Sequence, residues 1–307
     1  LIILSRQIMT PDVYFYGMTV MSTIHKLVSA YPEADSYGEI EKTFLCPGGE
    51  TMNAAILLSK LGLATKIGGP HWGRDTRDVL GSYADRYSID ATGIVYDDTF
   101  PGVKDLILVD DKHRTVFGYF AKYFSETVKR WNEPERGAIA KAALVAIDPF
   151  FGDSSLHAAE YCVEYGKPYV TIDCRHDSYL NTHCGANVVS REYRSQEYIN
   201  ISDEEAFRLF QESTEGLVIF TSGKNEILFA RKGGAVQRFS PYLVEVKSTL
   251  GAGDTFRAGV VYGLSQKWDD ARVVQFASAL AAVVCTRLPI ADNPPTLDEV
   301  IAFISQR

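Results

Sequence analysis

A glycine-rich segment near the end of the chain has the residue types and spacing best suited to chemistry. It reads Ser248-Thr249-Leu250-Gly251-Ala252-Gly253-Asp254, follows a strand-like run and opens a helical pattern. Gly251 and Gly253 permit close backbone approach, and the first amides of a helix have no partner within it, so the segment predicts an anion site. Asp254 is then placed to accept a proton from a hydroxyl that attacks a bound phosphoryl group. The alternative interpretation is a tight turn in which Asp254 caps the helix.

A second glycine-rich segment lies near the beginning. It reads Pro47-Gly48-Gly49-Glu50-Thr51-Met52-Asn53 and leads into a helical pattern at residues 54–61. Glycine backbones approach a polyol closely, and the Asn53 amide both donates to and accepts from hydroxyls. The segment therefore predicts the floor of a substrate site. The alternative is a helix start whose glycines serve only the turn.

The elements that position these segments follow from the alternation of apolar and amphipathic runs. Continuous apolar runs occupy residues 13–16, 64–67, 144–147, 169–172 and 217–221, and helical patterns lie between them at 54–61, 76–86, 155–165 and 203–211. Such strands, separated by helices, indicate an α/β fold with a mainly parallel sheet covered on both faces. The last third is mostly helical, at 253–264, 269–287 and 297–306, with a capping box from Thr296 to Glu299.

Two stretches lack helices and predict a small β-rich lid. They cover about residues 22–45 and 104–120, and the second is a hairpin turning at Asp110-Asp111-Lys112. The lid has no core of its own, so we expect residues 1–307 to form a single α/β domain.

Composition excludes several classes of protein. The 307 residues include 31 Lys and Arg against 39 Asp and Glu, a net charge of −8, which disfavours nucleic-acid and membrane-surface partners. The longest apolar run, residues 279–285, is too short to span a membrane. The five cysteines are an odd number without a CxxC pair, which favours a reduced, cytoplasmic chain.

Other motifs have little support. The sequence has no Walker A, GxGxxG, GxSxG or HExxH motif, so P-loop, nicotinamide, hydrolase and zinc-protease chemistry have no basis in it. The cluster Cys174, His176, His183 and Cys184 is an alternative metal site, but its spacing matches no common zinc module.

Taken together, the two glycine segments resemble the two signatures of the ribokinase-like (PfkB) carbohydrate kinases. The similarity extends from about Tyr14 to Phe303 and includes intermediate blocks at residues 67–75, 104–120 and 221–223. The resemblance implies a three-layer α/β/α fold with a β-rich lid. It also implies an enzyme that uses ATP and Mg²⁺ to phosphorylate a hydroxymethyl group of a sugar or sugar derivative. Lid strands with exposed apolar faces commonly bind a partner, so we expect a homodimer formed through the lid.

The resemblance assigns roles to individual residues. Asp254 is the implied base, and the amides of Gly251, Ala252 and Gly253 form the implied anion hole. The remaining assignments are Gly48, Gly49, Asn53 and Ser22 for the substrate, and Thr221, Gly223, Thr249 and Ser278 for the nucleotide.

Three positions depart from the family pattern. Ser22 stands where members often carry an Asp that grips two substrate hydroxyls, and a neutral hydroxyl binds more weakly than a carboxylate. Ser248, together with residues 287–290, replaces groups that help to hold a monovalent cation, which makes activation by such a cation doubtful. Residues 190–193, Ser-Arg-Glu-Tyr, replace an NxxE element, so Glu192 is expected to act on Mg²⁺ through water.

Two other functions remain open. The first is a nucleoside kinase of the same fold, in which Phe100, Phe117 and Phe120 stack a base. The second is a catalytically idle ligand-binding relative, which the missing anchor residues suggest. The intact loop before Asp254 argues against idleness.

Overall fold

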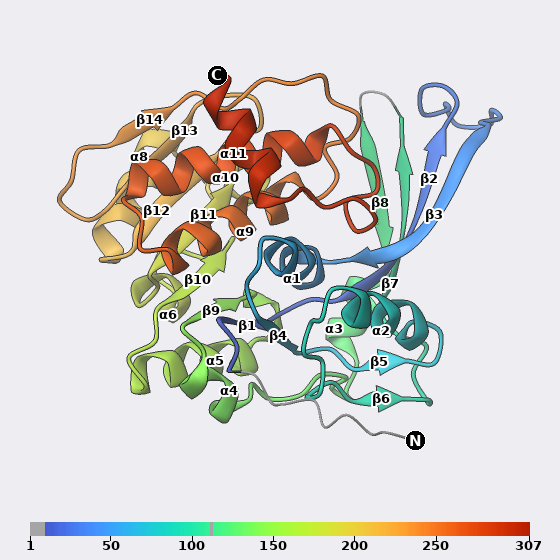
Figure 1. The fold of residues 1–307 in the computed structure, drawn as a ribbon, viewed down its shortest axis with the longest axis horizontal. Coiled ribbons are helices and arrows are strands. Elements are labelled where there is room, and N and C mark those ends of the chain that lie inside the picture. Colours follow the sequence, from blue (N-terminus) through green and yellow to red (C-terminus); the bar gives the residue numbers. More distant parts are fainter. Residues whose placement is uncertain (1–9, 111–112) are drawn as a thin grey trace.

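The fold is built on one large, mainly parallel sheet. The computed structural model describes residues 10–110 and 113–307 (Figure 1), and within them the main sheet has eight strands in the order β14-β13-β12-β11-β10-β9-β1-β4. The parallel strands are β1 (Val13–Tyr16), β4 (Thr65–Gly68), β9 (Leu144–Ile147), β10 (Tyr169–Ile172), β11 (Ala186–Ser190) and β12 (Leu217–Thr221). β13 (Ile227–Ala230) and β14 (Gln237–Phe239) add an antiparallel edge.

Helices cover both faces of this sheet, which confirms the predicted three-layer α/β/α fold. One face packs against α1 (Glu50–Lys60), α9 (Ala252–Ser265) and α10 (Asp270–Cys285). The other packs against α4 (Arg136–Lys141), α5 (Asp153–Glu164) and α8 (Asp203–Ser213). The remaining helical elements are α2 (Arg77–Arg86), η1 (Pro149–Phe151), α6 (Tyr179–Thr182), α7 (Arg191–Glu197) and α11 (Leu297–Ser305).

Sequence patterns account for where several helices begin. The predicted capping box of Thr296 and Glu299 starts α11 and is confirmed by both reciprocal hydrogen bonds. Ser202 and Glu205 form a second capping box, at α8, that the sequence analysis did not single out. No helix of residues 10–110 and 113–307 is long and apolar enough to cross a membrane.

A second sheet stands to one side of the α/β body (Figure 1). It consists of β2 (Val20–Leu27), β3 (Ile40–Gly48), β7 (Lys104–Val109) and β8 (Arg114–Gly118) in the order β3-β2-β7-β8, and we call these four strands the lid. β2 and β7 pair in parallel, whereas the other two pairs are antiparallel. Asp111 and Lys112 of the predicted turn lie outside the described residues.

Short elements join the lid to the body. The helix α3 (Phe120–Ser125) follows β8 directly and was not predicted, because six residues are too few to establish a helical period. The paired strands β5 (Trp72–Gly73) and β6 (Tyr96–Asp97) precede β7 in the chain.

Candidate active site

A cavity of about 500 Å³ is lined by the lid strands, the start of α1, the ends of β10 and β11, and the loop before α9. Parallel strands present their carboxyl ends at one edge of a sheet, where ligand crevices form. The cavity gathers eight of the residues predicted from the two glycine segments and their neighbours: Ser22, Gly48, Gly49, Asn53, Glu192, Gly251, Gly253 and Asp254. Residues from opposite ends of the chain therefore share one cavity.

The centre of the cavity is a hydrogen-bonded pair from α1 and α9. Asn53 Nδ2 donates to Asp254 Oδ2 over 2.8 Å, although the two residues are 201 positions apart. Gly251 precedes α9 with a φ of 69°, a conformation that other residues rarely adopt, so the backbone there calls for glycine. The pair fixes the carboxylate of Asp254 at the beginning of a helix.

The environment of Asp254 favours proton acceptance. Burial raises the pKa of this carboxyl, while the Asn53 hydrogen bond and the charge of Arg257 act in the opposite direction. A carboxylate that is buried but still hydrogen-bonded is a stronger base than an exposed one. Proton transfer becomes more effective as the pKa of the accepting carboxyl approaches that of the hydroxyl that loses the proton. The site therefore suits removal of a proton from a hydroxyl.

The amides at the start of α9 are not equally available. The Ala252 N–H donates to the Thr249 carbonyl over 3.2 Å, and the Thr255 N–H donates to the Gly251 carbonyl over 2.9 Å. Ala252 must give up its bond to reach an anion, whereas Gly253 lines the cavity directly. Of the three predicted amide donors, Ala252 is thus the one that the loop already engages.

Glu50, which the sequence analysis left unassigned, places a second carboxyl in the same cavity. Burial, and then the charges of Asp254 and Asp148, raise the pKa of Glu50 to about 8. At neutral pH Glu50 is therefore mainly protonated beside Asp254. The only signal in the sequence was an acid directly after a glycine pair, and acids are common in the first turn of helices.

The native state should consequently lose stability as the pH rises. The pKa of Glu50 lies above its ordinary value near 4.5, so the folded protein keeps a proton that the unfolded chain releases between about pH 4.5 and 8. We expect Glu50→Gln to remove part of this loss, so that the melting temperature falls roughly 3–6 °C less than that of the wild type between pH 5 and pH 8. Thermal unfolding at the two pH values measures this difference.

Glu204→Gln is the matched control, because Glu204 is an exposed acid in the first turn of another helix, α8. It should leave the wild-type pH dependence unchanged. Equal pH dependence in Glu50→Gln and the wild type would contradict the raised pKa.

A buried ion pair lies behind the cavity and was not predicted. Asp148 and Arg257 form it, and both side chains are fully buried. The Asp148 carboxylate also accepts hydrogen bonds from the Met18 N–H at 2.7 Å and the Thr51 hydroxyl at 3.1 Å. It thereby connects the ends of β1 and β9 with the first turn of α1 and the second turn of α9. No local pattern signals a pair separated by 109 residues.

Two carboxylates at the ends of β10 and β11 fit a magnesium ion. Asp173 and Glu192 both line the cavity, and Asp173 accepts hydrogen bonds from the Ser190 N–H and hydroxyl at 2.7 and 2.9 Å. Burial and the charge of Glu192 raise the pKa of Asp173. A hard divalent cation prefers such oxygen ligands and would relieve their mutual repulsion. Asp173 joins the predicted Glu192 here, and its signal was an acid at the carboxyl end of a buried strand.

The side chains of the alternative zinc cluster, Cys174, His176, His183 and Cys184, contact neighbouring groups of the protein. Cys184 Sγ donates to the Asn181 carbonyl, His176 bonds to the Tyr198 hydroxyl, and the His183 ring stacks on Tyr179. In the described part of the chain, no group of three or more His, Cys, Asp or Glu side chains is arranged to hold a metal ion.

The four predicted nucleotide residues do not share the cavity of Asp254. Thr221 ends β12, and its carbonyl accepts from Arg194 Nη1 at 3.1 Å. Ser278 on α10 accepts from the Tyr242 N–H at 3.4 Å, and Thr249 accepts from Ala252. Gly223 has a φ of 61° in the loop after β12. Its neighbours line a separate cavity of about 630 Å³, which includes Ser222, Lys224, Asn225, Arg191 and Arg238.

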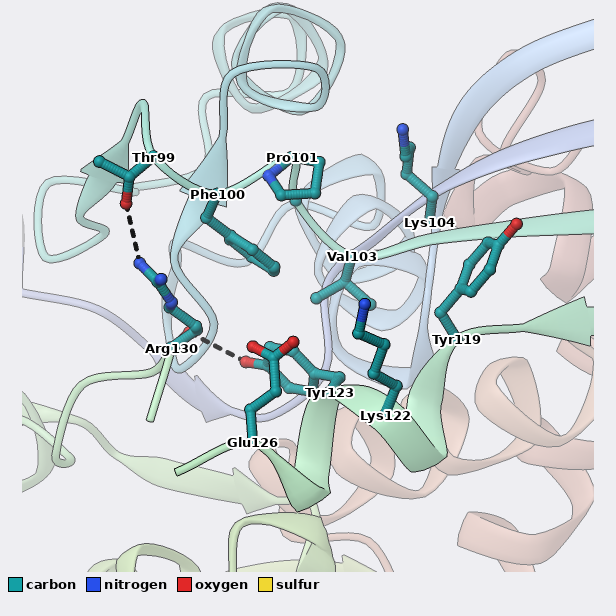
Figure 2. A pocket seen from close by; sticks show the side chains of 11 residues that line it. Thr99, Phe100, Pro101, Val103, Lys104, Tyr119, Lys122, Tyr123, Glu126 and Arg130 are labelled. Atoms are coloured by element: carbon teal, nitrogen blue, oxygen red, sulfur yellow. Dashed lines mark hydrogen bonds between the residues drawn. The ribbon is translucent and has the colours of Figure 1, made fainter. Parts of the chain in front are cut away.

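Two of the three aromatic side chains suggested for base stacking do not line the cavity of Asp254. Phe120 lines the cavity of Asp254. Phe100 lies in a different cavity of about 430 Å³ beside Tyr123 and Arg130 (Figure 2), and Phe117 is 46% exposed. Of the three, only Phe120 lies at the cavity of Asp254 in the described part of the chain.

Comparison of the sequence with known proteins gives consistent results. Residues 193–297 match the family described as pfkB family carbohydrate kinase. A 5-dehydro-2-deoxygluconokinase of Lacticaseibacillus casei is 24% identical over 291 residues, covering 84% of this chain and 86% of the relative. A 5-dehydro-2-deoxygluconokinase of Geobacillus kaustophilus is 28% identical over 104 residues, and this match spans 34% of this chain and 31% of that relative.

Solved structures share the fold. Ribokinase from Thermotoga maritima superposes with a TM-score of 0.78 at 19% identity, covering 96% of this chain and 99% of that one. Arabidopsis thaliana ribokinase, complexed with ribose and ATP, gives 0.79 at 17% identity over 96% and 99%. A nucleoside kinase from Methanocaldococcus jannaschii gives 0.76 at 19% identity over the same shares. At these identities the likeness establishes the ribokinase fold.

Proposed function

We propose that the chain is a carbohydrate kinase of the pfkB family, which residues 193–297 match, and that it transfers the terminal phosphoryl group of ATP to a hydroxymethyl group of a sugar or sugar derivative. The observation that carries this proposal is the hydrogen bond of 2.8 Å between Asn53 and Asp254. It joins the substrate floor of Gly48 and Gly49 to the anion-binding start of α9 within one cavity. Phosphoryl transfer requires such positioning more than it requires covalent chemistry by the protein.

Each part of the cavity has a role in the proposed reaction. Asp254 accepts the proton of the substrate hydroxyl as its oxygen attacks the terminal phosphorus of ATP, and ADP leaves. The backbone amides at the start of α9 hold the transferred group, and Asn53 orients both the carboxylate and a substrate hydroxyl. Asp173 and Glu192 would hold Mg²⁺. When bound, this ion neutralises charge on the phosphates.

The apolar inner face of the lid supports the proposal that water is excluded from the reacting groups. Ile24, Ile107 and Val116 lie on three adjacent strands in register and line the cavity. An apolar row above the reacting groups keeps out water that would otherwise compete with the sugar hydroxyl as acceptor.

A sugar acid is the substrate class that we propose to test first. The two curated relatives are named as kinases of 5-dehydro-2-deoxygluconate, which is a sugar acid. Arg114 is the only Lys or Arg among the described residues that line the cavity. A guanidinium there matches a carboxylate by charge and by bidentate geometry.

The proposed function is tested by ADP release across a panel of acceptors: 5-dehydro-2-deoxygluconate, other sugar acids, ribose, fructose, simple polyols and nucleosides. We expect ATP- and Mg²⁺-dependent turnover with a sugar or sugar acid. Turnover restricted to nucleosides would replace the sugar with a nucleoside as acceptor. No ADP release with any acceptor would contradict the kinase activity.

We also propose that two copies associate through the outer face of the lid. Leu45, Thr23, Leu106 and Phe117 form one row across the four strands. Three of them, Leu45, Leu106 and Phe117, are large apolar residues that are 50%, 37% and 46% exposed, respectively. Large apolar side chains exposed on one face of a sheet are typical of a surface that binds a partner.

Phe117→Lys should disrupt this association, because it places a charge at the proposed interface. We expect the wild type to sediment as a dimer at micromolar concentration and the variant as a monomer. Ile199→Lys is the control, since Ile199 is 70% exposed in the loop after α7. A wild-type monomer, or equal dissociation of both variants, would contradict dimerisation through the lid.

We also propose that the protein is located in the cytoplasm. All five cysteines are free, and four of them are buried. Unpaired thiols in this number are typical of chains that fold in a reducing compartment.

A further inference from the structure

The inner face of the lid carries a carboxylate that the proposed mechanism does not use. Asp105 on β7 lies directly opposite Ser22 on β2 in the parallel pair, and both side chains line the cavity of Asp254. Asp105 Oδ1 is almost inaccessible to solvent and has no hydrogen-bond partner in the described part of the chain. Of the buried side-chain atoms without a partner there, it is the one whose residue lines this cavity.

The surroundings of Asp105 do not compensate its charge. Burial raises the pKa of Asp105 to about 6, and a hydrogen bond with the Ser22 hydroxyl lowers it. Cys46, opposite Ser22 on β3, is buried and neutral. Asp105 forms no ion pair with residues 10–110 or 113–307. At neutral pH the carboxylate is therefore mainly ionised with unused acceptor capacity, which destabilises a folded protein unless a ligand satisfies it.

The position of Asp105 relative to Ser22 suggests what that ligand is. Ser22 occupies the place where a carboxylate that grips sugar hydroxyls is expected, and it is neutral. Adjacent strands are about 4.8 Å apart, so Asp105 offers a carboxylate one strand further along the same face. Asp105 itself lines the cavity that also contains Gly48 and Asn53. An ionised carboxylate is an acceptor only, and its natural partners are hydroxyl donors.

We infer that Asp105 anchors hydroxyls of the sugar substrate from β7, in place of an anchor at position 22 on β2. This inference rests on the proposed function, because it takes the ligand to be a polyol chain held for phosphorylation at Asp254. It identifies Asp105 as a residue that determines specificity. Displacing the anchor by one strand selects substrates whose hydroxyls reach β7.

Calorimetric titration tests the inference without requiring turnover. Wild type, Asp105→Asn, Asp105→Ser and the double variant S22D/D105S are titrated with 5-dehydro-2-deoxygluconate, ribose and fructose in the presence of a non-hydrolysable ATP analogue. We expect Asp105→Asn to weaken binding of the preferred sugar about 10- to 100-fold, the loss typical of a hydrogen bond to a charged group. The double variant should bind at least about 10-fold more tightly than Asp105→Ser, because it returns a carboxylate to β2.

Thermal unfolding and ADP release separate the possible outcomes. Weaker binding with an unchanged or higher melting temperature supports the anchor, because Asn relieves an uncompensated buried charge. Wild-type affinity in Asp105→Asn, or a lower melting temperature with unchanged affinity, overturns the anchor and leaves the kinase activity intact. Sugar binding without ADP release overturns the kinase activity but not the anchor. If none of the three sugars binds the wild type, the anchor is overturned, and the kinase activity is then decided by ADP release across the full panel of acceptors.

Discussion

Replacement of Asp254 by Asn is expected to lower kcat at least ~10²-fold, because it removes the only group that we assign to proton acceptance. The substitution preserves shape, and the carbonyl of the new amide can still accept from Asn53 Nδ2, which lies 2.8 Å from Asp254 Oδ2 in the wild type. Burial of the carboxylate, which raises its pKa, also means that the neutral amide should not destabilise the fold. Steady-state kinetics with the best acceptor, together with thermal unfolding, measures both effects.

Asp298→Asn provides the matched control for this substitution. Asp298 is also an acid in the first turn of a helix, α11, but it is exposed and does not line the cavity. Any general effect of removing a negative charge from a helix start should appear in both variants. Unchanged kcat in Asp254→Asn, or an equal loss in the control, would exclude Asp254 as the base.

The central part of the site was predictable because glycine carries local information. Gly251 adopts a φ that other residues avoid, so a glycine at this place in the sequence indicates a turn with an unusual backbone conformation. The same reasoning applies to Gly49, with a φ of 83°. Buried parallel strands likewise appear as continuous apolar runs. These local signals identify the two segments, and the family resemblance that the segments carry together implies that Asn53 and Asp254 share one site.

The charged groups around that centre were not predictable in the same way. Asp105 faces the cavity only because β7 pairs in parallel with β2, and no local pattern specifies that two residues 83 positions apart are neighbours. The only local signal for Asp105 was an acidic residue between Lys104 and the apolar end of β7. Charged residues are common where strands begin, so this signal does not indicate a site. The places of Thr221 and Ser278, which were predicted to bind the nucleotide, are likewise set by the packing of β12 and α10, so no local pattern specifies where they lie relative to Asp254.

Arg257→Met should destabilise the fold far more than Asp254→Asn or Asp105→Asn. It leaves the carboxyl of Asp148 fully buried without its cationic partner, with the Met18 N–H and the Thr51 hydroxyl as its remaining donors. Breaking a buried ion pair by removing one partner typically costs about 3–5 kcal/mol. For a chain of this size, that corresponds to a fall in melting temperature of roughly 6–15 °C. Thermal and urea unfolding measure the change.

Two further variants decide whether the loss comes from the unpaired charge. D148N/R257M removes both charges and should recover part of the stability, which a double-mutant cycle quantifies. Arg136→Met breaks the exposed pair with Glu164 and should change stability by less than about 1 kcal/mol. Equal effects of Arg257→Met and Arg136→Met would contradict the role of the buried pair. Because the charge of Arg257 also lowers the pKa of Asp254, its loss should make the base easier to protonate and reduce activity at acidic pH even in the molecules that remain folded.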